Sequence, residues 1–349
     1  MTTPEVTVRG AGIFGLSVAW ACCRRGARVR VIDPGGPGAG ASGGVVGALA
    51  PHAPEGWNAL KAFQLDSLLM AEAFWAEVRD TGGIDPGYAR LGRLQPVADA
   101  AALARARERA AGAAAHWQGR AGWEVIPAAE ARGWAPASPT GWLVRDTLSA
   151  RLHPRRACAA LAAAIVARGG EVTAEGADAG RVVRATGAAG LAEIGGGFGT
   201  GVKGQAALLN FDMRDRPQLY AEGLHVVPHA DGTVAVGSTT ERDYEDPVST
   251  DEQLDEVIAR AAAAVPVLHG ARVMERWAGL RPRARSRAPV LGPHPAHPGQ
   301  FIANGGFKIG FGMAPKAAEA MADLLLEGRE DAIPDALRPE RSLPRGGAG

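Results

Sequence analysis

The sequence has little cysteine and no long apolar run. Its three cysteines, Cys22, Cys23 and Cys158, are too few for a disulfide framework and lack the spacing of metal ligands, so no disulfides and no metal site are expected. No stretch reaches about 18 consecutive apolar residues, which argues against a membrane-spanning helix. Residues 5–9 already have the pattern of a strand, without the basic and apolar segments of a secretion signal before them. These absences together predict a cytoplasmic protein.

Neither sign of charge is in excess, because 38 Lys and Arg residues are balanced by 37 Asp and Glu residues and the formal net charge is +1. A nucleic-acid-binding chain usually carries a basic excess or a basic stripe, so nucleic acid is not expected as a partner. Lysine itself is rare: only Lys61, Lys203, Lys308 and Lys316 are found among the 38 basic residues. The length of 349 residues suffices for two domains, or for one large domain with an insertion.

Residues 5–33 carry the pattern of a dinucleotide-binding unit. A short strand over 5–9 leads into Gly10-Ala-Gly12-Ile-Phe-Gly15, an apolar helical stretch to about residue 25, a second strand over 29–32, and Asp33. In such a unit the glycines permit a tight turn, a close approach of the backbone to a pyrophosphate, and close packing of the helix on the strand. The helix N-terminus favours phosphates, and the acidic residue accepts a hydrogen bond from a ribose. The motif predicts a dinucleotide cofactor without separating FAD from NAD.

The segment that follows Asp33 is built almost entirely from small residues up to Pro51, so its backbone can lie against a large flat cofactor. It contains a G-x-S-x-G pattern, but no strand precedes and no helix directly follows the serine, as the nucleophile turn of a hydrolase requires. The glycine turn, Ala41-Ser42 and residues 47–51 resemble the start of the FAD-dependent D-amino-acid-oxidase superfamily, of the glycine-oxidase and sarcosine-oxidase type. The resemblance implies FAD contacts from Gly10, Gly12, Ile13, Phe14, Gly15, Asp33, Ala41, Ser42, Gly47, Ala48 and Leu49.

Two later segments carry the same resemblance. Residues 182–187 form an apolar strand that ends in Ala-Thr-Gly, and in the superfamily the matching segment returns the chain to the FAD sheet. Residues 304–315 (N-G-G-F-K-I-G-F-G-M-A-P) would lay backbone along the flavin before a helix expected over 316–327. Non-covalent FAD is expected, because no cysteine follows Cys158 in the region where sarcosine oxidases attach the cofactor. The implied contacts are Ala185, Thr186, Gly187, Gly305, Gly306, Phe307, Lys308, Ile309 and Gly310.

The expected substrate site rests on residues 277–282 (W-A-G-L-R-P) and 288–292 (A-P-V-L-G), which resemble a superfamily segment whose arginine binds a substrate carboxylate. The planar guanidinium of Arg281 suits this role, since it can make two charge-assisted hydrogen bonds at once. Lys308 is implied to polarise the flavin or to assist Arg281, and a structural role for it stays open. His225 falls where glycine oxidases carry an aromatic hydroxyl. It either lines the pocket or is an ordinary strand histidine.

The expected fold class is α/β. A Rossmann-type FAD-binding domain of the glutathione-reductase type, discontinuous in sequence, is joined to an α+β substrate domain with an antiparallel sheet. Residues 225–228 and 233–239 are expected to form a hairpin, and a capping box at residues 249–252 is expected to open the helix 254–265. Helices are also expected over 60–78, 97–117 and 153–167. The expected domain ranges are 1–82, 141–205 and 276–349 for FAD binding, and 83–140 and 206–275 for substrate binding.

The resemblance predicts oxidation of the C–N bond of a small amino acid or secondary amine by hydride transfer to flavin N5. Arg281, Lys308 and His225 are the expected catalytic residues, and oxygen or another electron acceptor is the expected second partner. A homo-oligomer stays open. One alternative is flavin-dependent trimming of a modified wobble nucleoside in tRNA, because residues 40–49 also resemble the flavin domain of such an enzyme. Another is a non-catalytic subunit that binds FAD or passes electrons to a partner.

Overall fold

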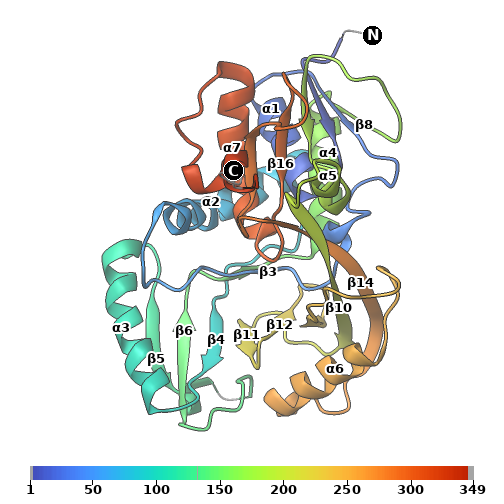
Figure 1. Cartoon of the computed structure of the whole chain (residues 1–349). Coiled ribbons are helices and arrows are strands. Elements are labelled where there is room, and N and C mark those ends of the chain that lie inside the picture. Colours follow the sequence, from blue (N-terminus) through green and yellow to red (C-terminus); the bar gives the residue numbers. More distant parts are fainter. Residues whose placement is uncertain (1–2, 132, 345–349) are drawn as a thin grey trace.

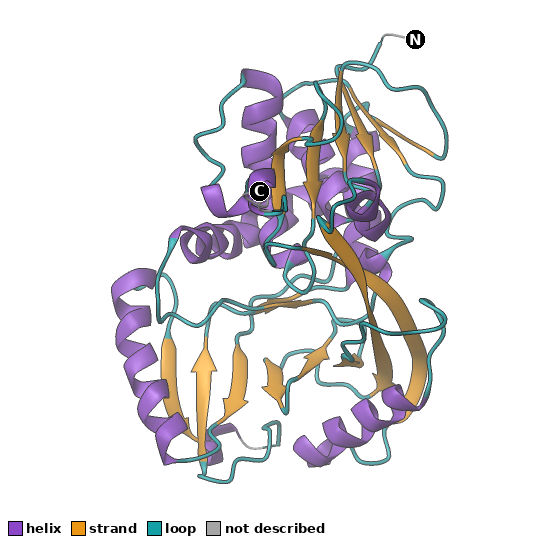
Figure 2. Cartoon of the chain, in the orientation of Figure 1, coloured by secondary structure: helices purple, strands orange, loops and turns teal. Residues whose placement is uncertain are grey.

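The chain folds around two large sheets, drawn one above the other in Figure 1, with a two-stranded sheet between them. The computed structural model describes residues 3–131 and 133–344. Residues 1–2, 132 and 345–349 of the expected domain ranges lie outside this described part. Helices cluster around the upper sheet, whereas the lower sheet has helices mainly at its two ends (Figure 2). The arrangement confirms the expected α/β fold class.

The upper sheet has six strands in the order β15-β16-β9-β1-β2-β8. Five of them run parallel, and β15 is antiparallel to β16. Because the strands are parallel, the carboxyl ends of β1, β2 and β9 meet at one edge, where α/β proteins place their ligands. The strands are β1 (Val6–Arg9), β2 (Val29–Ile32), β8 (Glu171–Thr173), β9 (Arg181–Arg184), β15 (Val290–Pro293) and β16 (Phe301–Asn304).

Four helices pack against one another beside this sheet: α1 (Ile13–Arg24), α2 (Ala59–Gly82), α4 (Pro154–Ala167) and α7 (Gly310–Ala322). Helix α1 is buried continuously from Ile13 to Cys23, because its sequence is apolar or small on every side. Helix α2 is capped by Asn58, whose side chain accepts from the backbone N–H of Lys61, and it ends at Gly83 in the left-handed conformation. These helices and the sheet share the larger hydrophobic core.

The lower sheet has eight strands in the order β14-β10-β13-β12-β11-β4-β6-β5, and all pairs except β4 with β11 are antiparallel. The long strands β10 and β14 pair from Gly199 with Ala284 to Asn210 with Arg272, and they connect the two halves of the molecule (Figure 1). The strands are β4 (Arg93–Pro96), β5 (Trp123–Pro127), β6 (Trp142–Asp146), β10 (Gly199–Asn210), β11 (Gln218–Ala221), β12 (Leu224–Pro228), β13 (Thr233–Gly237) and β14 (Arg272–Ala284).

The remaining elements connect these layers. Helix α3 (Ala100–Trp117) packs on β5, α6 (Glu252–Ala264) packs on β10 and β13, and α5 (Gly187–Glu193) packs on β10 and β14. Strands β3 (Ala48–Leu49) and β7 (Ala150–Arg151) form the small central sheet. No helix in the described ranges is both long and apolar enough to cross a membrane. The short helical turns are η1 (Ala41–Gly43), η2 (Ala128–Ala131), η3 (Pro266–Leu268), η4 (Asp323–Glu327), η5 (Asp335–Leu337) and η6 (Pro339–Arg341).

The dinucleotide-binding unit and the β12–β13 hairpin form where the sequence predicts them. Helix α3 begins at Ala100 and not at residue 97, and two further helix starts differ. Helix α6 is capped by Asp251, whose carboxylate accepts from the backbone N–H of Gln253, and not by Ser249. Helix α7 begins at Gly310 and includes Pro315, where the sequence suggested a start at residue 316. The buried first turns of α7 pack against α1 and α2, so tertiary packing offsets the hydrogen bond that proline cannot donate.

The strand pairing differs from the expected domain division at three places, because β6, residues 199–205 of β10 and residues 276–284 of β14 all belong to the eight-stranded sheet. Strand β6 pairs with β4 and β5 in the eight-stranded sheet, although the division grouped residues 141–205 with the FAD-binding domain. The division stays a prediction, and residues 142–146 belong by their pairing to the other sheet.

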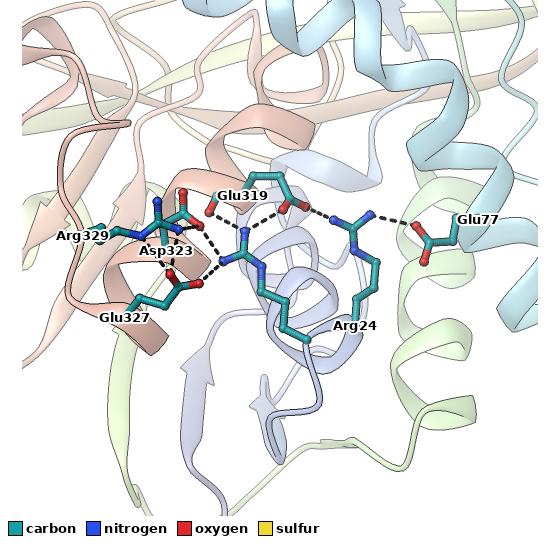
Figure 3. Close-up of polar contacts among 7 residues, drawn as sticks. Arg24, Glu77, Glu319, Asp323, Glu327 and Arg329 are labelled. Atoms are coloured by element: carbon teal, nitrogen blue, oxygen red, sulfur yellow. Dashed lines mark hydrogen bonds and ion pairs between the residues drawn. The ribbon is translucent and has the colours of Figure 1, made fainter.

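An ion-pair network joins the C-terminal end of α1 to α2 and α7 (Figure 3). Arg24 contacts Glu77 at 2.9 Å and Glu319 at 2.6 Å. Arg25 contacts Glu319 at 2.8 Å and Asp323 at 2.6 Å. Because several partly shielded charges share partners, this network stabilises the helix layer more than isolated surface pairs would.

Candidate functional site

The turn between β1 and α1 requires glycine at two of its three glycine positions, Gly10 and Gly15. Gly10 has a φ of +108°, and a Cβ on it would lie 2.4 Å from the carbonyl oxygen of Ala185. Gly12 is the N-cap of α1, and a Cβ on Gly15 would lie 1.9 Å from the carbonyl oxygen of Gly10. The turn therefore brings bare backbone and the start of a helix to the carboxyl end of β1, as phosphate-binding turns do.

Asp33 and Ser42 tie this turn to the loops around it. The Asp33 carboxylate at the end of β2 accepts from the backbone N–H of Ala11 at 2.7 Å and from that of Gly35 at 2.9 Å. Each carboxylate oxygen keeps a further lone pair, so Asp33 can still accept a ribose hydroxyl. The Ser42 hydroxyl accepts from the backbone N–H of Ile13 at 2.9 Å and so caps the start of α1.

One cavity of about 800 Å³ runs from Asp33 and the glycine turn to Arg281 and Lys308. Gly40 and Gly187 lie in its wall, and a Cβ on either would meet no protein atom within 4 Å. The cavity thus has bare backbone on its walls and helix N–H groups at one end, which fits the large flat ring and the pyrophosphate of FAD. Of the expected cofactor residues, it is lined by Gly10, Gly12, Ile13, Phe14, Asp33, Ala41, Ser42, Gly47, Ala48, Ala185, Thr186, Gly187, Gly306, Phe307, Lys308 and Gly310.

Four expected cofactor residues lie behind the cavity wall. Gly15 packs against Gly10, and Leu49 is fully buried in the core. Gly305 has a φ of +77° and faces Ala284 and Ala288, while Ile309 packs on the larger core at the start of α7. These four residues shape the backbone that their neighbours present to the cavity.

Arg281, on β14, lies in the cavity wall and is only 9 % exposed. Its Nη1 donates to the Ser238 hydroxyl at 2.6 Å, and its Nη2 donates to the backbone carbonyls of Lys203 at 3.1 Å and Thr239 at 2.6 Å. Burial lowers the pKa of Arg281 to about 10, and the carboxylate of Glu241 acts in the opposite direction. At neutral pH the guanidinium is therefore a buried cation, already held by three acceptors.

Lys308 reaches the same end of the cavity because the chain after β16 is bonded to β14. Gly306 bridges Arg283, and the backbone N–H of Phe307 donates to the carbonyl of Pro282 at 3.0 Å. The Lys308 ammonium donates to the Thr240 hydroxyl at 2.9 Å, at the exposed side of the cavity. Its pKa is lowered, first by partial desolvation and second by the positive charge of Arg281. Two cations thus face one end of the cavity.

His225 lines the cavity beside Tyr220, with ring centroids 4.8 Å apart. Burial, with Arg93 and Lys308 as further causes, lowers the pKa of His225 to about 3. The ring is therefore neutral at physiological pH, and its Nδ1 has no hydrogen-bond partner in the described part of the chain. The position favours the pocket-lining alternative over an ordinary strand histidine. What His225 does there stays a prediction.

Several lining residues are not identified by the sequence motifs. Tyr220 faces the cavity only because β11 and β12 pair, and Ser238 only because β13 ends beside Arg281. No cysteine lines the cavity, and all three described cysteines are buried. No group of three or more His, Cys, Asp or Glu within 3–131 and 133–344 is arranged to hold a metal ion. Further cavity residues outside the motif assignments are Val45, Val46, Gly223, Pro247 and Val248.

The chain matches the family described as FAD dependent oxidoreductase over residues 5–324. It is 25 % identical to a glycine oxidase of Geobacillus kaustophilus over 94 % of either chain, and its fold superposes on the crystal structure of that enzyme with a TM-score of 0.82, covering 99 % of both chains at 23 % identity.

Two further similarities are narrower in what they show. A glycine oxidase of Pseudomonas putida is 34 % identical over 143 residues, which span 41 % of this chain and only 39 % of that protein. The iminodiacetate oxidase of Chelativorans sp. BNC1 has a TM-score of 0.81 at 23 % identity, with 97 % and 98 % of the two chains covered, and so shares the fold. With a family match over nearly the whole chain and a cavity whose walls suit the cofactor, this protein belongs to the FAD-dependent oxidoreductases of the D-amino-acid-oxidase type.

Proposed function

We propose that this protein oxidises the C–N bond of a small amino acid or N-substituted amino acid, with a free carboxylate on the carbon that loses hydride. The observation that carries the proposal is the buried cation Arg281 at the end of the cavity where Lys308 also lies. Asp33 is the single acidic residue among the described lining residues, and it lies at the glycine turn. An anionic group is therefore attracted to the Arg281 end.

The residues that would hold FAD divide along the cavity. The turn at Gly10 and Gly12 would receive the pyrophosphate, Asp33 the ribose, and the backbone at residues 44–48 and 306–308 the ring system. When bound, the flavin supplies a two-electron acceptor that takes hydride from the substrate. We propose non-covalent binding, because no cysteine lies in the cavity wall.

The protein's own part in the reaction is to bind and orient the substrate. Arg281 and Lys308 attract the carboxylate, and their positive charges also favour a neutral amine over an ammonium ion. A neutral amine is the form that can lose hydride from its α-carbon, and after loss of a proton it leaves as an imine that water hydrolyses. Neutral His225 and the hydroxyl of Tyr220 can bond that amine without adding charge. These residues supply orientation of the substrate and not a strong base.

The test is anaerobic bleaching of the protein-bound flavin by a panel of glycine, sarcosine, D-amino acids and proline-like imino acids. We expect members of the panel to bleach the flavin absorbance, while the matching decarboxylated amines do not. Bleaching by amines without a carboxylate, equally fast, would contradict the role of Arg281. Failure of every amine would favour the electron-transfer alternative. A salt-sensitive shift of tRNA in a gel would revive the tRNA alternative.

A further inference from the structure

The hydrogen bonds of Arg281 leave few of its N–H groups free for a substrate. A guanidinium has five N–H donors. Both hydrogens of Nη2 are taken by the carbonyls of Lys203 and Thr239, and one hydrogen of Nη1 points at the Ser238 hydroxyl. Nε is buried and has no hydrogen-bond partner within residues 3–131 and 133–344. Only the second hydrogen of Nη1 is left to face a substrate, so the usual two-pronged grip on a carboxylate is not offered.

The two carbonyls that hold Nη2 are fixed by a buried network beneath them. The backbones of Lys203 and Glu241 exchange two hydrogen bonds of 3.0 Å, and Thr239 N–H donates to the Gln205 carbonyl at 3.2 Å. Lys203 is 2 % exposed, and its ammonium nitrogen lies 3.5 Å from the Glu241 carboxylate and 3.4 Å from the Asp251 carboxylate. Opening this network would leave buried charges unpaired, which is costly.

The guanidinium itself has no room to turn away from these carbonyls. A Cβ on Gly204 would lie 2.4 Å from the Arg281 Cζ, so the backbone of β10 touches one face of the group. The ring of Phe307 lies on it as well, with its centroid 5.5 Å from Cζ. Arg281 is therefore a positioned cation whose orientation is set before the substrate arrives.

Ser238 stands next to the one available hydrogen. Its oxygen accepts from Nη1 at 2.6 Å, it is half-buried, and it lines the cavity. A hydroxyl that accepts one hydrogen bond still has its own hydrogen to donate. No acceptor among the described residues takes that hydrogen, and a hydroxyl that accepts from a cation is a stronger donor.

We propose that Ser238 is a substrate-binding residue: its hydroxyl and the free Nη1 hydrogen of Arg281 form the pair of donors that binds the two carboxylate oxygens. The inference rests on the proposed function for the identity of the anion. It differs from an arginine-only grip because half of the recognition is assigned to a neutral side chain after β13. Lys308 attracts the carboxylate by its charge, and one of its three ammonium hydrogens is donated to Thr240.

The test compares the flavin-loaded wild type with Ser238→Ala, Ser238→Thr and a matched control, Ser249→Ala. Ser249 is exposed on the loop between β13 and α6 and does not line the cavity. Acetate is titrated and followed by the flavin absorbance spectrum, with acetamide as the neutral probe of the same shape. We expect Ser238→Ala to weaken acetate binding about tenfold, the loss of one hydrogen bond to a charged group. The acetate affinity of Ser238→Thr and of Ser249→Ala should stay within about threefold of the wild type, since both variants keep a hydroxyl at position 238.

Turnover separates a binding role from a structural one. With the best amino acid of the panel, Ser238→Ala should raise KM while kcat and the melting temperature stay close to wild type. Should Ser238→Ala fail to retain flavin, Ser238→Cys, which keeps the size but donates weakly, is expected to weaken acetate binding likewise. Wild-type affinity for acetate in either variant would overturn the inference. Acetate binding that depends on Ser238 in a protein that no amine reduces would uphold the inference and reject the proposed function.

Discussion

Replacing Arg281 by lysine isolates what the guanidinium does beyond carrying charge. Lysine keeps the positive charge but has three N–H donors where arginine has five. Ser238, Lys203 and Thr239 already present three acceptors to this position. A lysine ammonium that satisfies those three has no hydrogen left for a substrate. We therefore expect Arg281→Lys to fold and to bind FAD, but to lose one charge-assisted hydrogen bond to the carboxylate.

The magnitude follows from that single bond. A hydrogen bond to a charged group contributes about 1.5–3 kcal/mol, which corresponds to a loss of about 10- to 150-fold in kcat/KM. Arg281→Met is the contrasting variant, because it leaves two buried carbonyls unsatisfied and removes a positive charge near Glu241. It should lose about 3–5 kcal/mol of stability as well as activity.

The assay measures kcat/KM with the best amino acid of the panel and the melting temperature from flavin fluorescence for both variants. Wild-type kcat/KM in Arg281→Lys would refute the donor count. A melting temperature for Arg281→Lys as low as that for Arg281→Met would refute the claim that the three acceptors can be satisfied by lysine.

Three further perturbations test other parts of the structure. Gly10→Ala should yield a folded protein with little bound FAD, because Gly10 has a φ of +108° and an added Cβ would meet the backbone of Ala185. The FAD content is measured as the ratio of the flavin to the protein absorbance, and stoichiometric FAD would contradict this expectation. Arg25→Ala should lose about 1 kcal/mol by denaturant unfolding, less in high salt, whereas Arg28→Ala, whose side chain is 54 % exposed, should lose almost nothing; equal losses would contradict the network. Burial lowers the pKa of His229 to about 4, so below about pH 6.5 the unfolded chain binds a proton at this histidine that the folded chain does not bind. The free energy of unfolding therefore falls as the pH drops towards 4. His229→Gln should make this fall less steep, and an unchanged slope would refute the assignment.

Local patterns predicted the cofactor half of the molecule well. The glycine turn, the apolar helix behind it and Asp33 lie within one continuous stretch, and their positions follow from backbone sterics and helix termini that neighbours in sequence determine. The start of α7 was misplaced because Pro315 normally marks a helix beginning, and burial against α1 and α2 outweighed that preference. The cap of α6 was misplaced by two residues, since both Ser249 and Asp251 are good capping residues and only the folded backbone selects one.

The substrate end was predictable only in part. The W-A-G-L-R-P pattern singled out Arg281, but nothing in it indicates that Ser238 and the carbonyls of Lys203 and Thr239 would occupy the guanidinium. Those partners come from β10 and from the segment after β13, strands that are adjacent to β14 or one strand removed from it in the sheet. Long-range pairing of this kind depends on register across the sheet, which a local pattern does not encode.

The scarcity of lysine pointed to Lys308, and the structure places Lys308 at the cavity beside Thr240. It also shows a second rare lysine, Lys203, buried under the site against Glu241 and Asp251. The sequence alone determined the cofactor-binding unit, the family resemblance and the candidate cations, because each depends on residues close together in the chain. Only the tertiary structure decided which donors of Arg281 stay free and which hydroxyl stands beside them, because hydrogen bonds between distant strands exist only once the sheet has formed.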